Sequence, residues 1–153
     1  MSLLHDEHRF RVYYSQYVEL MMETFFSRCE RVLCFSLLFL GAAALTLPTP
    51  GWLWGSGVIA CVTLQYLWNP GKLAINAHYQ AFRYQQLRDE FDRMTRDEFL
   101  QKMRLIERDD SPAINALLNP ARCRAYIALG WKQVEKLTFW ERCVACIAGG
   151  IPY

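Results

Sequence analysis

A stretch of 40 residues, numbers 32–71, contains no Asp, Glu, Lys or Arg. Charged residues make up 21% of the whole chain, so an uncharged stretch of this length indicates a segment in a different environment from the rest of the chain. Pro48, Pro50 and Gly51 interrupt it near its middle. Two apolar arms of about 16 to 20 residues, joined by a Pro/Gly turn, are typical of a transmembrane helical hairpin. We therefore expect an all-α membrane protein whose hairpin covers residues 32–71, with arms at about 32–47 and 51–68.

The rest of the chain divides into two parts around this hairpin. We expect residues 1–31 to form an N-terminal cytoplasmic helix, and residues 72–153 to form a long cytoplasmic helix followed by a bundle of short helices. Positive charges give the orientation, because Lys and Arg are enriched in cytoplasmic loops. Arg28 and Arg31 precede the first arm and Lys72 follows the second, whereas the turn carries no charge. Both termini are therefore expected in the cytoplasm, with the hairpin in the inner (cytoplasmic) membrane.

The arms contain small residues and a few uncharged polar residues. Small residues let transmembrane helices approach closely, because lipid supplies no hydrophobic force that holds the helices together. The polar side chains have two interpretations: hydrogen bonding to the backbone or between helices, or lining a pore when several hairpins assemble. One hairpin cannot enclose a pore, so conduction requires a homo-oligomer. The candidates for hairpin packing or pore lining are Ser36, Gly41, Gly55, Ser56, Ala60, Thr63 and Gln65.

Aromatic residues at both ends of the second arm are expected to mark the two membrane surfaces, since Trp and Tyr prefer that depth. Trp52 and Trp54 lie beside the turn, and Tyr66 and Trp68 lie at the opposite end. The 14 residues from Trp54 to Trp68 would cover about 21 Å in a helix, slightly less than the apolar core of a bilayer.

Two apolar stripes with helical spacing flank the hairpin. Before it, steps of three and four residues connect Phe10, Tyr14, Tyr17, Met21 and Phe25, and nothing interrupts the helical pattern before Val32. After it, the same steps form a coiled-coil-like seam, with one polar member. The hairpin brings both stripes to the same membrane face, so we expect them to pair as antiparallel helices. The seam consists of Leu73, Ala77, Gln80, Tyr84, Leu87, Phe91 and Met94.

Boundary signals predict several short helices in the last third of the chain. Thr95 with Glu98, and Thr138 with Glu141, each have the spacing of a capping box at a helix start. Ser111-Pro112 and Asn119-Pro120 are each expected to start another helix, with Pro at its first position; the second of these would run through Trp131 and Val134. The last helix is expected to stop at Gly149-Gly150 and is too short to span a membrane.

Motifs for catalysis and cofactors are missing from the sequence. It has no phosphate-binding glycine loop, nucleophile elbow, or zinc or calcium signature, so we expect no catalytic residue, metal or cofactor. His5 and His8 have a metal-binding spacing without a third ligand, and Cys143 with Cys146 forms a single CxxC. All cysteines placed in the cytosol are expected to be reduced. The net charge of +2 gives no indication of a nucleic-acid partner.

The order of elements resembles the SLATT proteins, which are two-transmembrane effectors of prokaryotic nucleotide-signalling and other antiviral defence systems. Residues 106–112, with Leu117, Leu118 and Asn119 after them, are similar to the acidic-proline step between the cytoplasmic helices of that family. The resemblance implies a self-associating channel that disrupts the membrane of an infected cell when a partner or ligand releases it. A regulatory protein or a nucleotide would then bind on the cytoplasmic side.

Two functions of different classes fit the sequence. The first is an oligomeric pore or channel, a toxic effector in bacterial antiphage defence. The alternative is a non-conducting membrane anchor or scaffold, whose seam from Leu73 to Met94 would recruit a soluble partner. A holin-like lysis protein is a third interpretation, although holins usually carry much less cytoplasmic mass.

Overall fold

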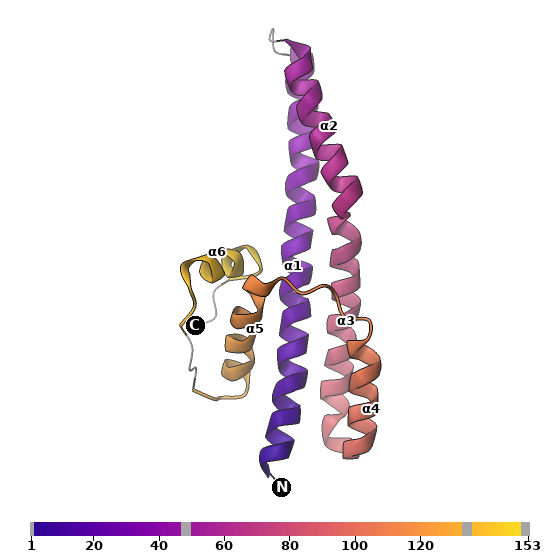
Figure 1. Ribbon diagram of the computed structural model, residues 1–153, viewed down its shortest axis with the longest axis vertical. Helices are drawn as coiled ribbons and strands as arrows, with labels where there is room; N and C mark the ends of the chain where they lie inside the picture. Colours follow the sequence, from indigo (N-terminus) through magenta and orange to yellow (C-terminus); the bar gives the residue numbers. More distant parts are fainter. Residues whose placement is uncertain (1, 47–49, 133–135, 151–153) are drawn as a thin grey trace.

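The computed structural model describes residues 2–46, 50–132 and 136–150, and, of residues 2–5, the backbone alone. Every regular element in the described ranges is helical, so the expectation of an all-α fold is confirmed. Helix α1 (Ser2–Thr46) has 45 residues and forms the axis of the molecule (Figure 1). It continues without a break from the charged N-terminal part into the first apolar arm, as its pattern predicted. At 1.5 Å per residue, α1 is about 68 Å long.

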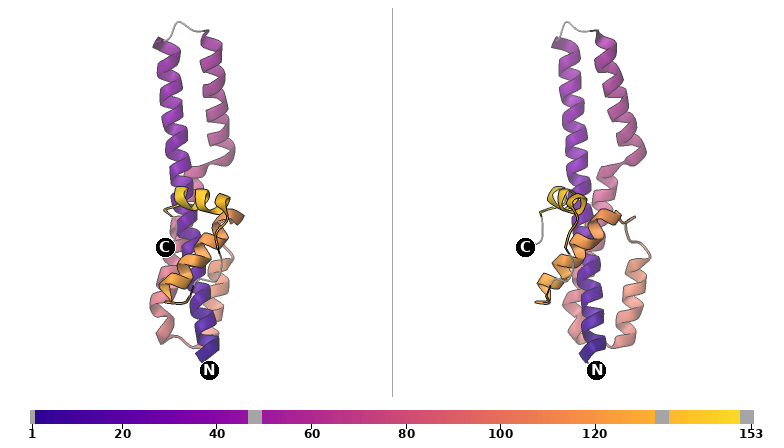
Figure 2. Two further views of the ribbon diagram at one scale, coloured as in Figure 1. Left: turned by 90° about the vertical axis from the view of Figure 1, so that its left-hand side faces the viewer. Right: turned by 60° about the vertical axis from the view of Figure 1, so that its left-hand side comes forward.

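The chain returns along α1 as two separate helices. Helix α2 (Gly51–Trp68) ends at Asn69, and α3 (Pro70–Glu90) starts directly after it. Figure 2 shows the change of direction between them. Asn69 has a left-handed backbone, with φ 44° and ψ 57°. The following Pro70 disfavours a right-handed helical conformation at the residue before it, and Asn tolerates the left-handed one better than most residues.

The packing around α1 forms two hydrophobic clusters. The first, nearer the apolar arms, joins Met21, Met22 and Phe26 of α1 to small residues of α3 and of the last two helices. The second lies nearer the N-terminus and surrounds Val12, together with Tyr84 of α3. Figure 1 shows the resulting arrangement, in which α3 and α4 lie on one side of α1 and α5 and α6 lie on the other.

The remaining elements are short: η1 (Phe91–Arg93), α4 (Arg96–Glu107), α5 (Asn115–Ala128) and α6 (Phe139–Ile147). Both predicted capping boxes, at Thr95 and Thr138, are present. Helix α6 ends as expected before two glycines, each of which has a positive φ (112° and 104°) that favours Gly.

The two predicted Pro starts are wrong. Helix α5 begins at Asn115 instead of Pro112, and the backbone N–H of Ser111 donates to Glu19 of α1. Pro120 lies inside α5, where its missing N–H removes one hydrogen bond, and its buried ring packs in the core. One helix therefore replaces the two that the sequence suggested. It ends before Trp131, and Val134 lies outside the described residues.

Candidate functional site

The apolar hairpin, formed by residues 32–46 of α1 and by α2, leaves most of its surface exposed. Helix α2 contains no buried residue, and in this part of α1 only Ala43 is buried. The exposed side chains are large and apolar: Leu38 is 74% exposed and Leu45 is 90% exposed. An exposed apolar surface of this extent is characteristic of contact with lipid or with another chain. Within the described residues, one helix is long and apolar enough to cross a membrane, namely α1 over Asp6–Thr46.

One glycine makes the closest approach between the two arms. A Cβ added to Gly57 would lie 3.2 and 3.3 Å from the two methyl carbons of Leu40. Gly41 and Gly55, the glycines proposed for hairpin packing, have nothing within 4 Å of an added Cβ among the described atoms. Among these three glycines, Gly57 is therefore the one at the close approach of the two arms.

The polar candidates of α2 fall into two groups. Ser56, Ala60 and Thr63 are exposed, and their spacing of four and three residues places them on one helix face. The Ser56 hydroxyl donates to the Leu53 carbonyl at 2.8 Å, so it is already satisfied by its own helix. Gln65 belongs to the other group, because its side chain points toward α1. Ser36 of α1 is half-buried.

The four aromatic candidates differ in their surroundings. Trp52 and Tyr66 are widely exposed, and Trp54 is half-buried. Trp68 packs edge-on against Phe26, with ring centroids 5.9 Å apart. This contact joins the end of the hairpin to the first hydrophobic cluster.

A polar junction connects α1, α2 and α3 where the hairpin ends. Gln65 Nε2 donates to Glu30 Oε1 at 2.8 Å, and the Cys34 sulfur lies 3.8 Å from the same nitrogen. A Cβ added to Gly71 would lie 3.5 Å from the Glu30 carboxyl carbon, so the carboxylate is next to the first turn of α3. The positive end of the α3 dipole favours a carboxylate at this place. Sequence reasoning missed Glu30; its position two residues before the uncharged stretch was the available signal.

The predicted seam faces α1. Ala77, Gln80, Tyr84, Leu87 and Phe91 are buried, and Leu73 and Met94 are partly buried at its two ends. The polar member, Gln80, donates from Nε2 to the Ile106 carbonyl at 3.4 Å and accepts from Arg83 at 3.3 Å. These bonds satisfy an amide that would otherwise be expensive to bury.

The acidic loop, residues 107–111, connects the end of α4 to α1 and α3. Arg11 of α1 binds the Glu107 carboxylate in a bidentate arrangement, at 2.6 to 2.9 Å. Arg83 of α3 forms an ion pair with Asp109 at 2.9 Å. Tyr84 donates its hydroxyl to Asp110 at 2.7 Å. Each acid of the predicted acidic-proline step therefore has a partner on α1 or α3.

Glu19 of α1 lies beneath this loop and is only 2% exposed. Its Oε1 accepts the backbone N–H of Ser111 at 3.0 Å. Its Oε2 and the Ser111 hydroxyl have no hydrogen-bond partner in the described part of the chain. Burial raises the pKa of Glu19 to about 7; the Ser111 N–H opposes this shift and the nearby Asp110 adds to it. Burial also raises the pKa of Asp110. Nothing in the sequence pattern marks this group, because Glu19 is one of several charged residues between the apolar positions of the first stripe.

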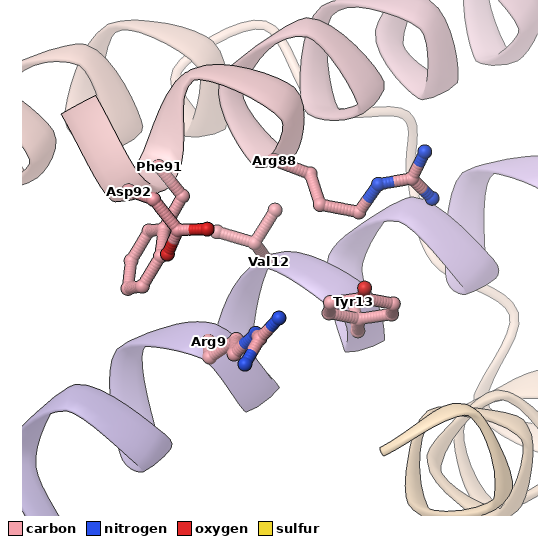
Figure 3. Close-up of a pocket in the computed structure, with 6 residues that line it drawn as sticks. All are labelled: Arg9, Val12, Tyr13, Arg88, Phe91 and Asp92. Atoms are coloured by element: carbon pink, nitrogen blue, oxygen red, sulfur yellow. The ribbon is translucent and has the colours of Figure 1, made fainter. Parts of the chain in front are cut away.

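A small cavity lies between α1 and the end of α3 (Figure 3). Arg88 lies above the Tyr13 ring, 5.5 Å from its centroid, and donates to Gln16 Oε1 at 3.0 Å. The cavity measures about 30 Å³, whereas sites for drug-sized ligands measure about 300 Å³ or more. It is therefore too small for a nucleotide. It is lined by Arg9, Val12, Tyr13, Arg88, Phe91 and Asp92.

The cysteines are all free, and Cys143 and Cys146 both lie on α6. No group of three or more His, Cys, Asp or Glu in the described residues is arranged to hold a metal ion. The His8 ring packs against Phe99 at 5.2 Å, and the side chain of His5 lies outside the described part.

Comparisons of the chain with protein-family models, with curated proteins and with solved structures find no match.

Proposed function

We propose that the chain is a two-span protein of the inner membrane, with its hairpin in lipid and both termini in the cytoplasm. The observation that carries this proposal is that α2, an uncharged helix of 18 residues, buries none of them within the chain. Its length of about 27 Å is close to the thickness of the apolar core of a bilayer. Arg28, Arg31 and Lys72 lie at the cytoplasmic end in this orientation, in agreement with the positive-inside rule.

In our proposal the hairpins assemble into an oligomeric pore. The exposed face of Ser56, Ala60 and Thr63 is weakly polar on an otherwise apolar helix, which suits the lining of a narrow pore. Below the hairpin, α3 exposes Ile75, Tyr79 and Phe82 at steps of four and three residues. Such a stripe outside the bilayer favours association with neighbouring copies.

The acidic loop supports a gated assembly. Its contacts connect the end of α4 to α1 and α3. The Glu30–Gln65 hydrogen bond and the Phe26–Trp68 contact in turn connect α1 to α2 of the hairpin. A partner or ligand that displaces the loop would therefore change the packing at the foot of the hairpin. Together with the resemblance to SLATT proteins, this favours a toxic effector that is held shut until a signal releases it.

The surface that the scaffold alternative would use is already covered within the chain. The seam from Leu73 to Met94 is occupied by α1 in the same chain, so a soluble partner cannot dock there without displacing α1. A scaffold would have to use the exposed faces of α4 or α6 instead.

Ion flux through liposomes that contain the purified full-length chain tests the proposal. We expect flux from an oligomer, and at least a tenfold loss when Ser56 and Thr63 are both replaced by Leu. Val62→Leu is the matched control, because Val62 is also exposed on α2 but lies about 100° around the helix from Thr63. A monomer in nanodiscs, or liposomes that stay tight at every protein density, would contradict the pore.

A further inference from the structure

Helix α6 carries an apolar face that no described part of the chain covers. Phe139 and Trp140 are about three-quarters exposed, and Ile147 is nearly half exposed. On the other side of the helix, Ala145 and the following Ala148 are fully buried in the first hydrophobic cluster. The helix is therefore amphipathic, but its more hydrophobic surface is the outer one.

The charges of α6 are arranged unequally around it. Its one acid, Glu141, accepts bonds from the Thr138 N–H and hydroxyl and from Asn119 Nδ2 at 2.6 Å, so it is held by the chain. Arg142 and, just before the helix, Lys136 are exposed. Arg142 lies about 60° around the helix from Phe139, so a basic side chain borders the exposed apolar face. An apolar face bordered by basic residues is typical of helices that lie on anionic membranes.

The position of α6 matches the level of a membrane surface. It crosses α1 on the side away from α3, and it lies on the hairpin side of α5 (Figures 1 and 2). Arg28 donates from Nη1 to the Cys146 carbonyl at 3.0 Å, and Arg124 donates to the Gly150 carbonyl at 2.8 Å. These bonds fix the C-terminal end of α6 to α1 and to α5.

The distance along α1 gives the depth of α6 relative to the bilayer. Arg28 precedes Val32, the first residue of the uncharged stretch, by four residues or about 6 Å of helix. The headgroup layer on each side of a bilayer is about 5 to 8 Å thick. Hence a helix held at Arg28 lies within this layer when the uncharged stretch occupies the apolar core.

We infer that α6 is an interfacial helix, which lies along the inner membrane surface and inserts Phe139, Trp140 and Ile147 among the headgroups of anionic lipid. The inference rests on the proposed two-span topology. It adds a third membrane contact to the chain, formed by a helix that does not span. Because Arg28 joins this helix to α1, lipid also holds the orientation of the bundle relative to the hairpin.

Spin labels on the full-length chain in phosphatidylcholine–phosphatidylglycerol vesicles measure this depth. The native Cys146 is exposed and takes the nitroxide, after the other five cysteines are replaced by Ala or Ser. Labels at Val62→Cys in the hairpin, on the side of α2 away from the proposed pore lining, and at Gln101→Cys on the exposed side of α4 provide the lipid and water references. The readout is the ratio of collision rates with oxygen, which concentrates in lipid, and with a water-soluble nickel chelate.

We expect the ratio at Cys146 to exceed that at Gln101→Cys several-fold and to stay below that at Val62→Cys. A ratio equal to the water reference overturns the inference while leaving the two-span topology intact. A water-like ratio at Val62→Cys overturns both. A Cys146 label shielded from both reagents and broadened by a second label shows that another copy covers α6, which also overturns the lipid assignment.

A second measurement leaves every cysteine in place. Trp140→Phe removes one tryptophan, and the difference from wild type isolates the emission of Trp140. We expect this emission to be quenched by lipids brominated near their carbonyl groups. Emission that these lipids do not quench would contradict the inference without relying on the cysteine replacements.

Discussion

Helix α1 passes through two regions that differ in how its apolar side chains are covered: they are buried within the chain in the first region and exposed in the second. In its first half, buried side chains such as Val12, Met21 and Phe26 contact α3 and the short helices. Beyond Val32 the same helix packs along α2, and most of its large side chains are exposed. The part of the chain outside the hairpin, here called the stalk, therefore contains its own packing partners, whereas the outer surface of the hairpin is not covered by any described part of the chain.

The two regions also differ in the contacts that hold them in place. The stalk is held by many specific contacts, and its opening requires several of them to break together. The arms of the hairpin pack against each other, for example at Gly57 and Leu40, but their large side chains face outward and are exposed. In the proposed assembly, lipid and neighbouring copies would cover these side chains.

Matched leucine truncations should give the largest difference between the two regions. Leu87 is 2% exposed in the stalk and Leu67 is 75% exposed in α2. We expect Leu87→Ala to lower the free energy of unfolding by about 2 to 5 kcal/mol, because it opens a cavity in a packed core. Leu67→Ala should change it by less than about 0.5 kcal/mol. Denaturant unfolding in detergent micelles, followed by near-UV circular dichroism, measures both, and equal losses would refute the contrast.

The buried carboxyl of Glu19 should make the stability of the stalk depend on pH. Its pKa is about 7 in the folded chain, compared with 4.5 as a free side chain. The protonated form is favoured by folding, so its contribution is fully present below pH 4.5 and is lost as the pH rises through 7. At pH 8 the loss is about 3 kcal/mol.

Glu19→Gln isolates this effect, because Gln keeps the acceptor for the Ser111 N–H and stays neutral at every pH. We expect the variant to be within about 1 kcal/mol of wild type at pH 5 and to be more stable at pH 8 by about 3 kcal/mol. Glu7→Gln is the control, since Glu7 is exposed on the same helix. Melting temperatures recorded from pH 5 to pH 8 check the prediction; identical pH profiles for Glu19→Gln and wild type would contradict it.

The difference between the two regions also explains which features the sequence predicted. The all-helical fold, the unbroken α1 and both capping boxes follow from local patterns, and the structure contains each of them. These features depend on residues within a few positions of one another, so spacing alone reveals them.

The polar groups of the stalk depend on residues far apart in the chain. Glu19 and Ser111 are 92 positions apart, and Gln65 and Glu30 are 35 apart. No local pattern distinguishes Glu19 from Glu23 or Glu30, which are only partly buried. Only the fold brings Ser111 next to Glu19, so spacing along the chain could not reveal this bond.

The junction between the two regions offers the smallest and most local test. Asn69 separates α2 from α3 with a left-handed backbone, and its side chain accepts from the Lys72 N–H at 3.3 Å. Asn69→Ala keeps a Cβ but loses this acceptor and tolerates the left-handed conformation less well, so we expect a loss of about 1 to 2 kcal/mol. Asn69→Gly relieves the backbone strain and loses only the side-chain bond, so it should cost a few tenths of a kcal/mol. Melting temperatures of the two variants in the same detergent separate the cases. If Asn69→Ala is as stable as wild type, the bend is not fixed by Asn69, and α2 and α3 can join as one straight helix that transmits movement of the stalk directly into the hairpin.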